Sequence, residues 1–159
     1  MDRDDIAIEA RPRITPDQLF AFYEKNDICE KGYGRELAAK PLQGSDLVVG
    51  AFQGDRLVGL VRALFDGLSA EIVECSLDLE LQGGGSTFEN GSLIEHDASG
   101  VGRRLMETTI RELQAMGADF ISSCVLAGIE EGFYRSLGFK LNEGAVQYII
   151  DRRPYVPQE

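Results

Sequence analysis

The chain has 159 residues, a length typical of one domain with a single hydrophobic core. Apolar residues make up 43% of it, which is too many for an intrinsically disordered protein. Its 27 acidic and 16 basic residues give a net charge of −11, which argues against a nucleic-acid-binding protein, because such a protein needs a basic face for phosphates.

The first part of the sequence predicts a strand and two helices. Residues 6–10 alternate in the manner of a short strand. Thr15 suits the N-cap of a helix and Pro16 its first helical position, where the backbone needs no N–H donor. A second short helix is expected over residues 35–40, and Pro41 is expected to stop it because proline removes a helical hydrogen bond.

Three strands are expected in the middle of the sequence. Segments 46–52 and 56–65 are rich in Val, Leu and Phe, and Gly54-Asp55 between them is a hairpin signal. Segment 71–81 is the longest alternating run in the chain and predicts a long strand. The residues that follow, 83–92, are rich in Gly, Ser and Asn and predict a loop.

The C-terminal part predicts helices that alternate with strands. A helix over residues 100–116 has apolar side chains at helical spacing, and Gly117 suits its C-terminal cap. The elements expected after it are a strand over 120–126, a helix over 129–137 and a final strand over 145–150. Together the elements predict a single domain over residues 1–159, of the α/β (α+β) class, with one mixed sheet.

Cysteine and histidine usage excludes two kinds of site. Cys29, Cys75 and Cys124 are odd in number and far apart, so they predict neither a disulfide framework nor a zinc site. His96 is the only histidine, which excludes a metal site built from several histidines. The N-terminus has no basic region followed by an apolar run, and no apolar run is long enough to span a membrane. We therefore expect a cytoplasmic protein with no metal site and no membrane partner.

Two motifs in the second half of the sequence resemble a known family. The segment Gly132-Phe133-Tyr134-Arg135-Ser136-Leu137-Gly138-Phe139 follows the helix start Gly100-Val101-Gly102-Arg103-Arg104-Leu105. This pair resembles the closing signature of the GNAT N-acetyltransferase superfamily, and the order of elements is similar over nearly the whole chain. The resemblance implies a mixed, mostly antiparallel central sheet flanked by helices, and acetyl-CoA as cosubstrate.

The resemblance also implies where acetyl-CoA and its chemistry would be placed. Backbone N–H groups at a glycine-rich helix start can hold a diphosphate. In the family pattern Tyr134 protonates the sulfur of coenzyme A, whereas the plain interpretation is a ring packed beside Phe133 and Phe139. The implied cofactor-binding residues are Cys75, Leu77, Gln82, Ser99, Gly100, Val101, Gly102, Arg103 and Arg104.

The helix start departs from the family pattern at one position. The pattern has Gln or Arg three residues before the first glycine, where this chain has Asp97. Gln82, at the end of the predicted long strand, is the alternative residue for that role, and it implies that residues 83–97 are an insert. An acidic insert beside a diphosphate weakens its binding unless the loop folds outward.

A general base for an amine acceptor is sought among two glutamates of the predicted long strand. Ala70-Glu71-Ile72-Val73-Glu74-Cys75 is similar to the central strand of the histone-acetylating branch, in which the residue matching Glu71 is the base. Glu74 is its geometric competitor. Side chains three positions apart on a strand face opposite sides, so at most one can reach a given substrate. The alternatives are a solvated strand edge, a substrate-binding carboxylate, or water as the base.

An acidic stretch of the sequence is relevant to the charge of the amine that would accept the acetyl group. From Ala63 to Gly102 the chain has eight carboxylates and no Lys or Arg. A solvated acidic face accounts for this, and so does a site for a small cationic amine or a basic peptide end.

We expect an N-acetyltransferase that moves an acetyl group directly to a primary amine. The alternatives are a non-catalytic acyl-CoA-binding or interaction module, a binding protein whose insert covers the former acetyl-CoA pocket, and a transferase with another acyl group or an oxygen acceptor. A homodimer is expected by analogy alone.

Overall fold

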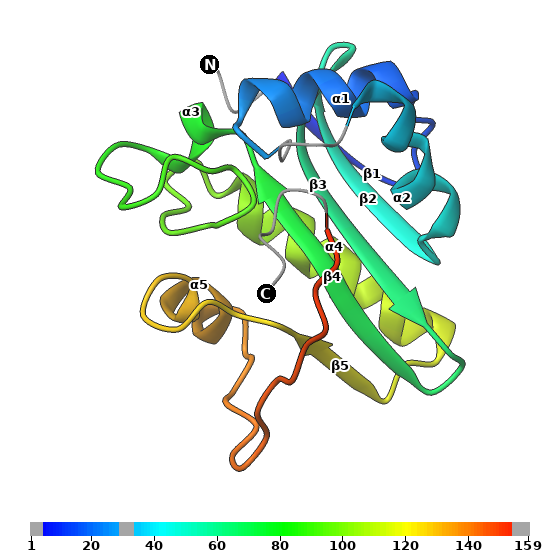
Figure 1. Cartoon of the computed structure of the whole chain (residues 1–159), viewed down its shortest axis with the longest axis vertical. Helices are drawn as coiled ribbons and strands as arrows, with labels where there is room; N and C mark the ends of the chain where they lie inside the picture. Colours follow the sequence, from blue (N-terminus) through cyan, green and yellow to red (C-terminus); the bar gives the residue numbers. More distant parts are fainter. Residues whose placement is uncertain (1–4, 29–33, 154–159) are drawn as a thin grey trace.

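The computed structural model describes residues 5–28 and 34–153, and a five-stranded sheet forms its centre (Figure 1). The strands follow one another across the sheet in chain order. They are β1 (Ile6–Ala10), β2 (Leu47–Gln53), β3 (Arg56–Phe65), β4 (Ser69–Leu77) and β5 (Phe120–Ser123). The pairs β1–β2, β2–β3 and β3–β4 are antiparallel, whereas β5 is parallel to β4. This confirms the predicted mixed, mostly antiparallel sheet.

Helices cover both faces of the sheet. Helix α4 (Val101–Met116) packs across β1 to β4 on one face. Helix α1 (Pro16–Lys25) packs on β3 from the other face, beside the short 3₁₀ helix η2 (Arg35–Leu37) and α2 (Ala39–Gly44) (Figure 1). Two short helices, α3 (Leu79–Gln82) and α5 (Glu131–Ser136), follow β4 and β5 in the chain. Of the predicted site residues, Gln82 lies in α3 and Tyr134 lies in α5.

The apolar side chains form one cluster on each face of the sheet. Val61, Leu105 and Met106 belong to the cluster under α4, while Leu19 and Leu60 belong to the one under α1. Gly59 in β3 shows how closely α4 approaches, because a Cβ on it would lie 2.6 Å from Leu105 Cδ1. Burial of this apolar surface is the main stabilising contribution to the fold.

The local signals at element ends are confirmed. Thr15 forms a capping box with Gln18, in which each side chain accepts the other's backbone N–H. Gly54 turns the β2–β3 hairpin with a φ of 60°. Gly117 ends α4 with a φ of 106°, a left-handed conformation that glycine adopts without strain.

Three element boundaries differ from the prediction. Pro41 lies inside α2 instead of ending a helix, in the first turn, where its missing N–H breaks no helical bond. The long strand ends at Leu77 because Asp78 caps the N-terminus of α3 with its side chain, so residues 79–82 are helical. Strand β5 ends at Ser123, three residues earlier than predicted, since its pairing with β4 stops there.

The predicted final strand over residues 145–150 is absent from the described part of the chain. The segment Ala-Val-Gln-Tyr-Ile-Ile is rich in apolar residues, but it pairs with no strand that the structure describes. Tyr148 and Ile150 are 91% and 93% exposed. Residue type favours a strand, but a strand forms only where its backbone pairs with a neighbouring strand. No described helix is long and apolar enough to cross a bilayer.

We expect Leu105→Ala to destabilise the fold far more than Leu141→Ala. Leu105 is fully buried between α4 and the sheet, whereas Leu141 is 70% exposed. Removing the buried side chain should lower the free energy of unfolding by about 2–5 kcal/mol, and the exposed one by less than about 0.5 kcal/mol. Urea unfolding followed by circular dichroism measures both. Equal losses would contradict the assignment of Leu105 to the core.

Candidate active site

A bulge in β4 brings Glu71 and Glu74 to the same face of the sheet. The register pairs Arg62 with Glu74 and Leu64 with Glu71, and the shift between these pairs leaves Val73 without a partner on β3. Since Arg62 and Leu64 are two residues apart on β3, they share a face, and so do their partners. The prediction that the two glutamates face opposite sides is therefore wrong, because it assumed an unbroken strand.

Strands β4 and β5 separate where their pairing ends. The parallel ladder runs from Ser69 opposite Phe120 to Ile72 opposite Ser123, immediately before the bulge. A cavity of about 700 Å³ lies beyond that point, between β4, the segment after β5 and the helices α1 and α2. Side chains from all of these elements line it, among them Tyr23, Lys40, Arg62, Glu74, Cys75, Cys124, Glu130 and Tyr134.

Tyr134 reaches this cavity from α5. Its ring meets Phe133 and Phe139 edge-on, with centroids 5.6 and 5.3 Å away, so the predicted aromatic packing is present. The Ser123 hydroxyl donates to the Tyr134 oxygen over 3.1 Å, and no described residue accepts the Tyr134 O–H. Burial, with the nearby Cys75 thiol, raises the pKa of Tyr134. The phenol therefore keeps its proton and has a free donor in the cavity.

Glu130 is a buried carboxylate in the same cavity that the sequence analysis missed. It is 4% exposed and sits directly before α5. Its oxygens accept the N–H groups of Ile94 and Leu126 over 3.2 and 3.1 Å. Burial raises the pKa of Glu130, and these two hydrogen bonds only partly oppose the shift. The signal that could have found it is its place one turn before Tyr134, on the same side of the helix.

Glu74 is held in a network of polar side chains. Its Oε1 accepts the Tyr23 hydroxyl and the Arg62 Nε–H, each over 2.6 Å, and its Oε2 accepts the Ser76 hydroxyl. Burial alone would lower the pKa of Arg62, but the Glu74 carboxylate outweighs it and raises that pKa. The Arg62 guanidinium is the direct counterion of the Glu74 carboxylate, so the geometry favours a structural role. Glu71 is exposed and lines neither this cavity nor the second one described below.

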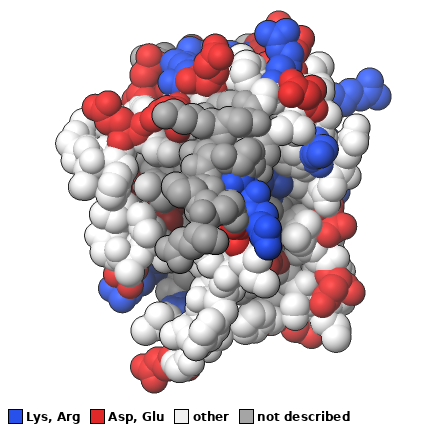
Figure 2. All heavy atoms as spheres, in the orientation of Figure 1, with Lys and Arg blue, Asp and Glu red and all other residues white. Residues whose placement is uncertain are grey.

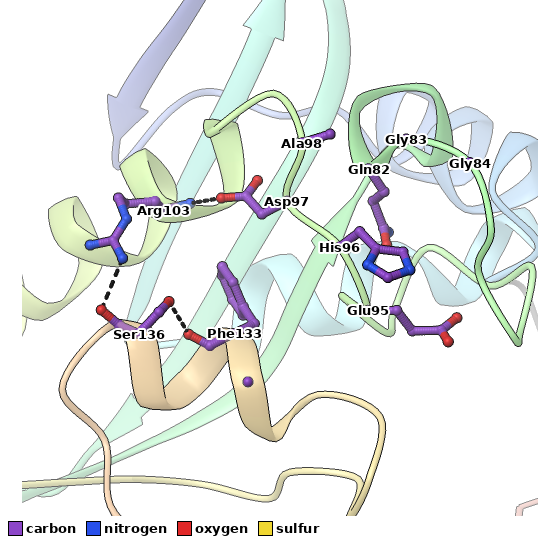
Figure 3. A pocket seen from close by; sticks show the side chains of 11 residues that line it. Gln82, Gly83, Gly84, Glu95, His96, Asp97, Ala98, Arg103, Phe133 and Ser136 are labelled. Carbon is purple, nitrogen blue, oxygen red and sulfur yellow. Dashed lines mark hydrogen bonds between the residues drawn. The ribbon is translucent and has the colours of Figure 1, made fainter.

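Asp97 occupies the N-terminus of α4. Its two oxygens accept the backbone N–H groups of Gly102 and Arg103 over 2.8 and 2.9 Å, and Figure 3 shows it pointing at the helix start. A Cβ on Gly102 would lie 2.8 Å from the carboxylate, so this close approach needs glycine. Burial raises the pKa of Asp97, while the two amide bonds lower it in part. The N–H groups predicted to bind a diphosphate are thus filled by the chain itself.

A second cavity, of about 670 Å³, lies between this helix start and α5 (Figure 3). Arg103 crosses it, donating from its guanidinium to the Ser136 carbonyl over 2.9 Å. Gln82 is fully buried in its wall and donates from Nε2 to the Leu77 carbonyl, while its Oε1 has no partner among the described residues. The remaining lining includes His96, Asp97 and Phe133.

Residues 83–97 form a loop whose two ends lie next to each other. The Ala98 N–H donates to the Gln82 carbonyl, so the two ends of the loop meet. Inside the loop, Gly91 accepts the Leu77 N–H over 2.8 Å, at the end of β4. Ile94 is fully buried in the cluster under α4. The loop therefore lies inward, against β4 and the start of α5, and its status as an insert stays a prediction.

Comparison with solved structures identifies the architecture. A protein from meticillin-resistant Staphylococcus aureus, described as a probable acetyltransferase, aligns with a TM-score of 0.69 at 18% identity, over 93% of this chain and 99% of its own. A GNAT family acetyltransferase from Streptococcus pneumoniae aligns with a TM-score of 0.66 at 20% identity, over 93% and 99%. The chain has the GNAT acetyltransferase fold.

A third neighbour is an aminoglycoside acetyltransferase from an uncultured soil metagenomic sample, in complex with sisomicin. It aligns with a TM-score of 0.66 at 17% identity, over 94% of this chain and 98% of its own. No protein-family model matches the sequence, and no curated protein matches it significantly. At these identities the likeness shows the GNAT fold alone.

The GNAT fold brings together only some of the predicted cofactor-binding residues. Gln82, Gly102 and Arg103 meet around the second cavity, beside Asp97. Arg104 points the other way and donates to the Ile6 carbonyl on β1. The remaining predicted residues lie in β4 and at the start of α4. Cys75 and Leu77 are buried in β4. The Ser99 hydroxyl accepts the Val101 N–H, and Gly100 makes the turn before α4 with a φ of 77°.

The acidic stretch is dispersed by the GNAT fold. Asp78 is buried and accepts the Lys25 ammonium over 2.8 Å, and Glu95 accepts the N–H groups of Thr87 and Phe88 within the loop. Figure 2 shows acidic and basic side chains interspersed on one face of the molecule. Six of the eight carboxylates have a donor among the described residues; these are Asp66, Glu74, Asp78, Glu80, Glu95 and Asp97. Among the described residues, no three His, Cys, Asp or Glu side chains form a metal cluster.

We expect Glu74→Gln to destabilise the protein more than Glu71→Gln. The first change leaves the Arg62 guanidinium, 19% exposed, without its counterion, and should lower the free energy of unfolding by about 3 kcal/mol. The second removes an exposed charge and should change it by less than about 0.5 kcal/mol. Urea unfolding of both variants tests this. A neutral Glu74→Gln would return Glu74 to the candidates for the general base.

Proposed function

We propose that the chain is an acetyl-CoA-dependent N-acetyltransferase that moves the acetyl group directly to a primary amine. The observation that carries the proposal is the Tyr134 phenol, buried, protonated and with an unused O–H in the cavity where β4 and β5 separate. The acetyltransferase neighbours with the same fold support acetyl transfer in general.

The cavity holds groups for both proton transfers of this reaction. When the amine nitrogen attacks the thioester carbonyl carbon, the ammonium must lose a proton, and the carbon–sulfur bond breaks. Tyr134 can deliver its proton to the departing sulfur. Glu130, the second buried carboxylate in the cavity, can accept the proton of the amine, since its raised pKa brings its basicity closer to neutral pH. Burial raises the pKa of Cys75, which keeps that thiol from acting as a nucleophile.

The acceptor we propose is a small primary amine. A positive charge on the acceptor is not favoured by the electrostatics of the cavity. The described lining of the cavity contains three basic residues, Lys40, Arg62 and Arg153, and two acidic ones, Glu74 and Glu130. Glu74 is already paired with Arg62. A panel of acceptors should therefore include a polyamine, an aminoglycoside, an amino acid and a neutral amine. The predicted homodimer stays a prediction, which light scattering can test.

A second candidate function is a non-catalytic acyl-CoA-binding or interaction module. The observation that favours it is the occupation of the helix start by Asp97 and of the Leu77 N–H by Gly91. Calorimetric titration with acetyl-CoA, beside a thiol-release assay over the amine panel, separates the two. Binding without thiol release would favour the module, and binding with release would favour the transferase.

We expect Tyr134→Phe to lower kcat by roughly 10²-fold or more while the affinity for acetyl-CoA changes little. The substitution removes the proton donor and keeps the ring that packs on Phe133 and Phe139. Thiol release and calorimetry measure the two quantities. The matched control is Tyr148→Phe, at an exposed position away from the cavity, which should be silent. A fully active Tyr134→Phe would leave the ring with a packing role only.

Glu130→Gln should lower kcat by roughly 10²-fold if Glu130 is the base. In the wild-type enzyme kcat should fall as the pH drops through the raised pKa of Glu130, because protonation removes the base. The glutamine variant should lack this acidic limb. Glu143→Gln, at an exposed position, is the control. Retention of both the rate and the limb in Glu130→Gln would assign the amine proton to water.

A further inference from the structure

Residues 91–97, called the strap here, fill polar positions on both sides of the opening between β4 and α5. On one side Gly91 accepts the Leu77 N–H at the end of β4 over 2.8 Å. On the other side the Asp97 carboxylate accepts the N–H groups of Gly102 and Arg103 in the first turn of α4. Between them, the side chain of Ile94 is fully buried and its N–H donates to Glu130. The strap thus presents a carbonyl, an apolar group and an anion in sequence.

Each strap contact matches one part of the ligand in the proposed function. A helix N-terminus with free N–H groups and a nearby glycine binds phosphate, and Asp97 supplies a carboxylate there instead. The Leu77 N–H is a donor for an amide carbonyl, and Gly91 supplies such a carbonyl. A long acyl thioester with an anionic diphosphate at its end carries the same groups in the same order. The strap and such a ligand would compete for these donors.

An independent observation points to a ligand at the same cavity. Gln82 is fully buried, and its Oε1 has no hydrogen-bond partner in the described part of the chain. Its Nε2 is fixed on the Leu77 carbonyl, so the amide cannot turn to satisfy both ends. A buried acceptor left without a donor is costly. Since Gln82 lines the cavity beside Asp97 and Arg103, the orphan oxygen calls for a ligand that carries a donor, such as an amide N–H, besides a diphosphate, which only accepts hydrogen bonds (Figure 3).

We propose that the strap is an autoinhibitory segment, and that a diphosphate-bearing ligand binds at the start of α4 only by displacing the Asp97 carboxylate. This inference rests on the proposed function for the identity of the physiological ligand. If the strap is displaced as one unit, the Ile94 N–H is also withdrawn from Glu130. Ligand binding would in this way free one oxygen of the buried carboxylate in the other cavity.

Calorimetric titration with inorganic pyrophosphate tests the strap without relying on acetyl transfer. Asp97→Ala should bind pyrophosphate more tightly than the wild-type protein, within the roughly 5- to 150-fold range typical of coupled sites. Glu89→Gln is the matched control, because it removes one negative charge from an exposed position of the same loop, with no described contact to α4. Equal affinities in all three proteins, or an equal gain in both variants, would overturn the inference.

Two further measurements keep the outcome clear. If Asp97→Ala folds poorly, Asp97→Asn removes the charge and keeps one acceptor, and it should show a smaller gain in pyrophosphate affinity. Hydrogen exchange should show faster exchange of the Gly102 and Arg103 amides in the Asp97 variants without ligand; unchanged protection would contradict the cap. A gain in pyrophosphate binding without thiol release from acetyl-CoA in any protein would overturn the proposed function and leave the strap standing.

Discussion

The candidate site depends on the end of the β4–β5 ladder. Parallel pairing holds the two strands together from Ser69 to Ile72, and the bulge at Val73 then interrupts β4. A strand pair that stops pairing leaves backbone donors and acceptors open, and the space beyond must be filled by side chains, by another segment or by a ligand. The cavity that contains Tyr134 and Glu130 is the direct consequence. Both residues reach it because α5 follows the separated strand.

Residues 91–97 of the chain itself fill space at the end of β4 and at the start of α4. A carbonyl at Gly91, the side chain of Ile94 and the carboxylate of Asp97 satisfy donors and bury apolar surface that a bound ligand would otherwise cover. Among the buried side-chain polar atoms of the described residues, Gln82 Oε1 and Ser86 Oγ are left without a hydrogen-bond partner. A site that is already satisfied can bind a ligand only by exchange, so affinity depends on the stability of the internal contacts as well as on the ligand.

Electrostatics at the two cavities is local despite the net charge of −11. Buried carboxylates are stabilised by specific partners: Glu74 by Arg62 and Tyr23, and Asp97 by backbone amides. Such pairing offsets the desolvation that each charge undergoes on burial. Glu130, like Asp97, has two backbone amides and no cation among its hydrogen-bond partners, and burial raises the pKa of both carboxyl groups. Glu130 is set apart by its place in the cavity that also contains Tyr134.

The sequence by itself determined the element order as far as α5, the capped ends of α1 and α4 and the β2–β3 hairpin, because these follow from local spacing and from glycine and proline chemistry. The role of Tyr134 follows from the family resemblance and stays a prediction. Only the tertiary structure decided the rest. The bulge at Val73 depends on register with β3, so spacing along one strand could not show that Glu71 and Glu74 share a face. Segment 145–150 is rich in apolar residues, as a strand is, but pairs with no described strand. The inward path of residues 83–97 depends on donors at Leu77 and Gly102 that lie far apart in sequence.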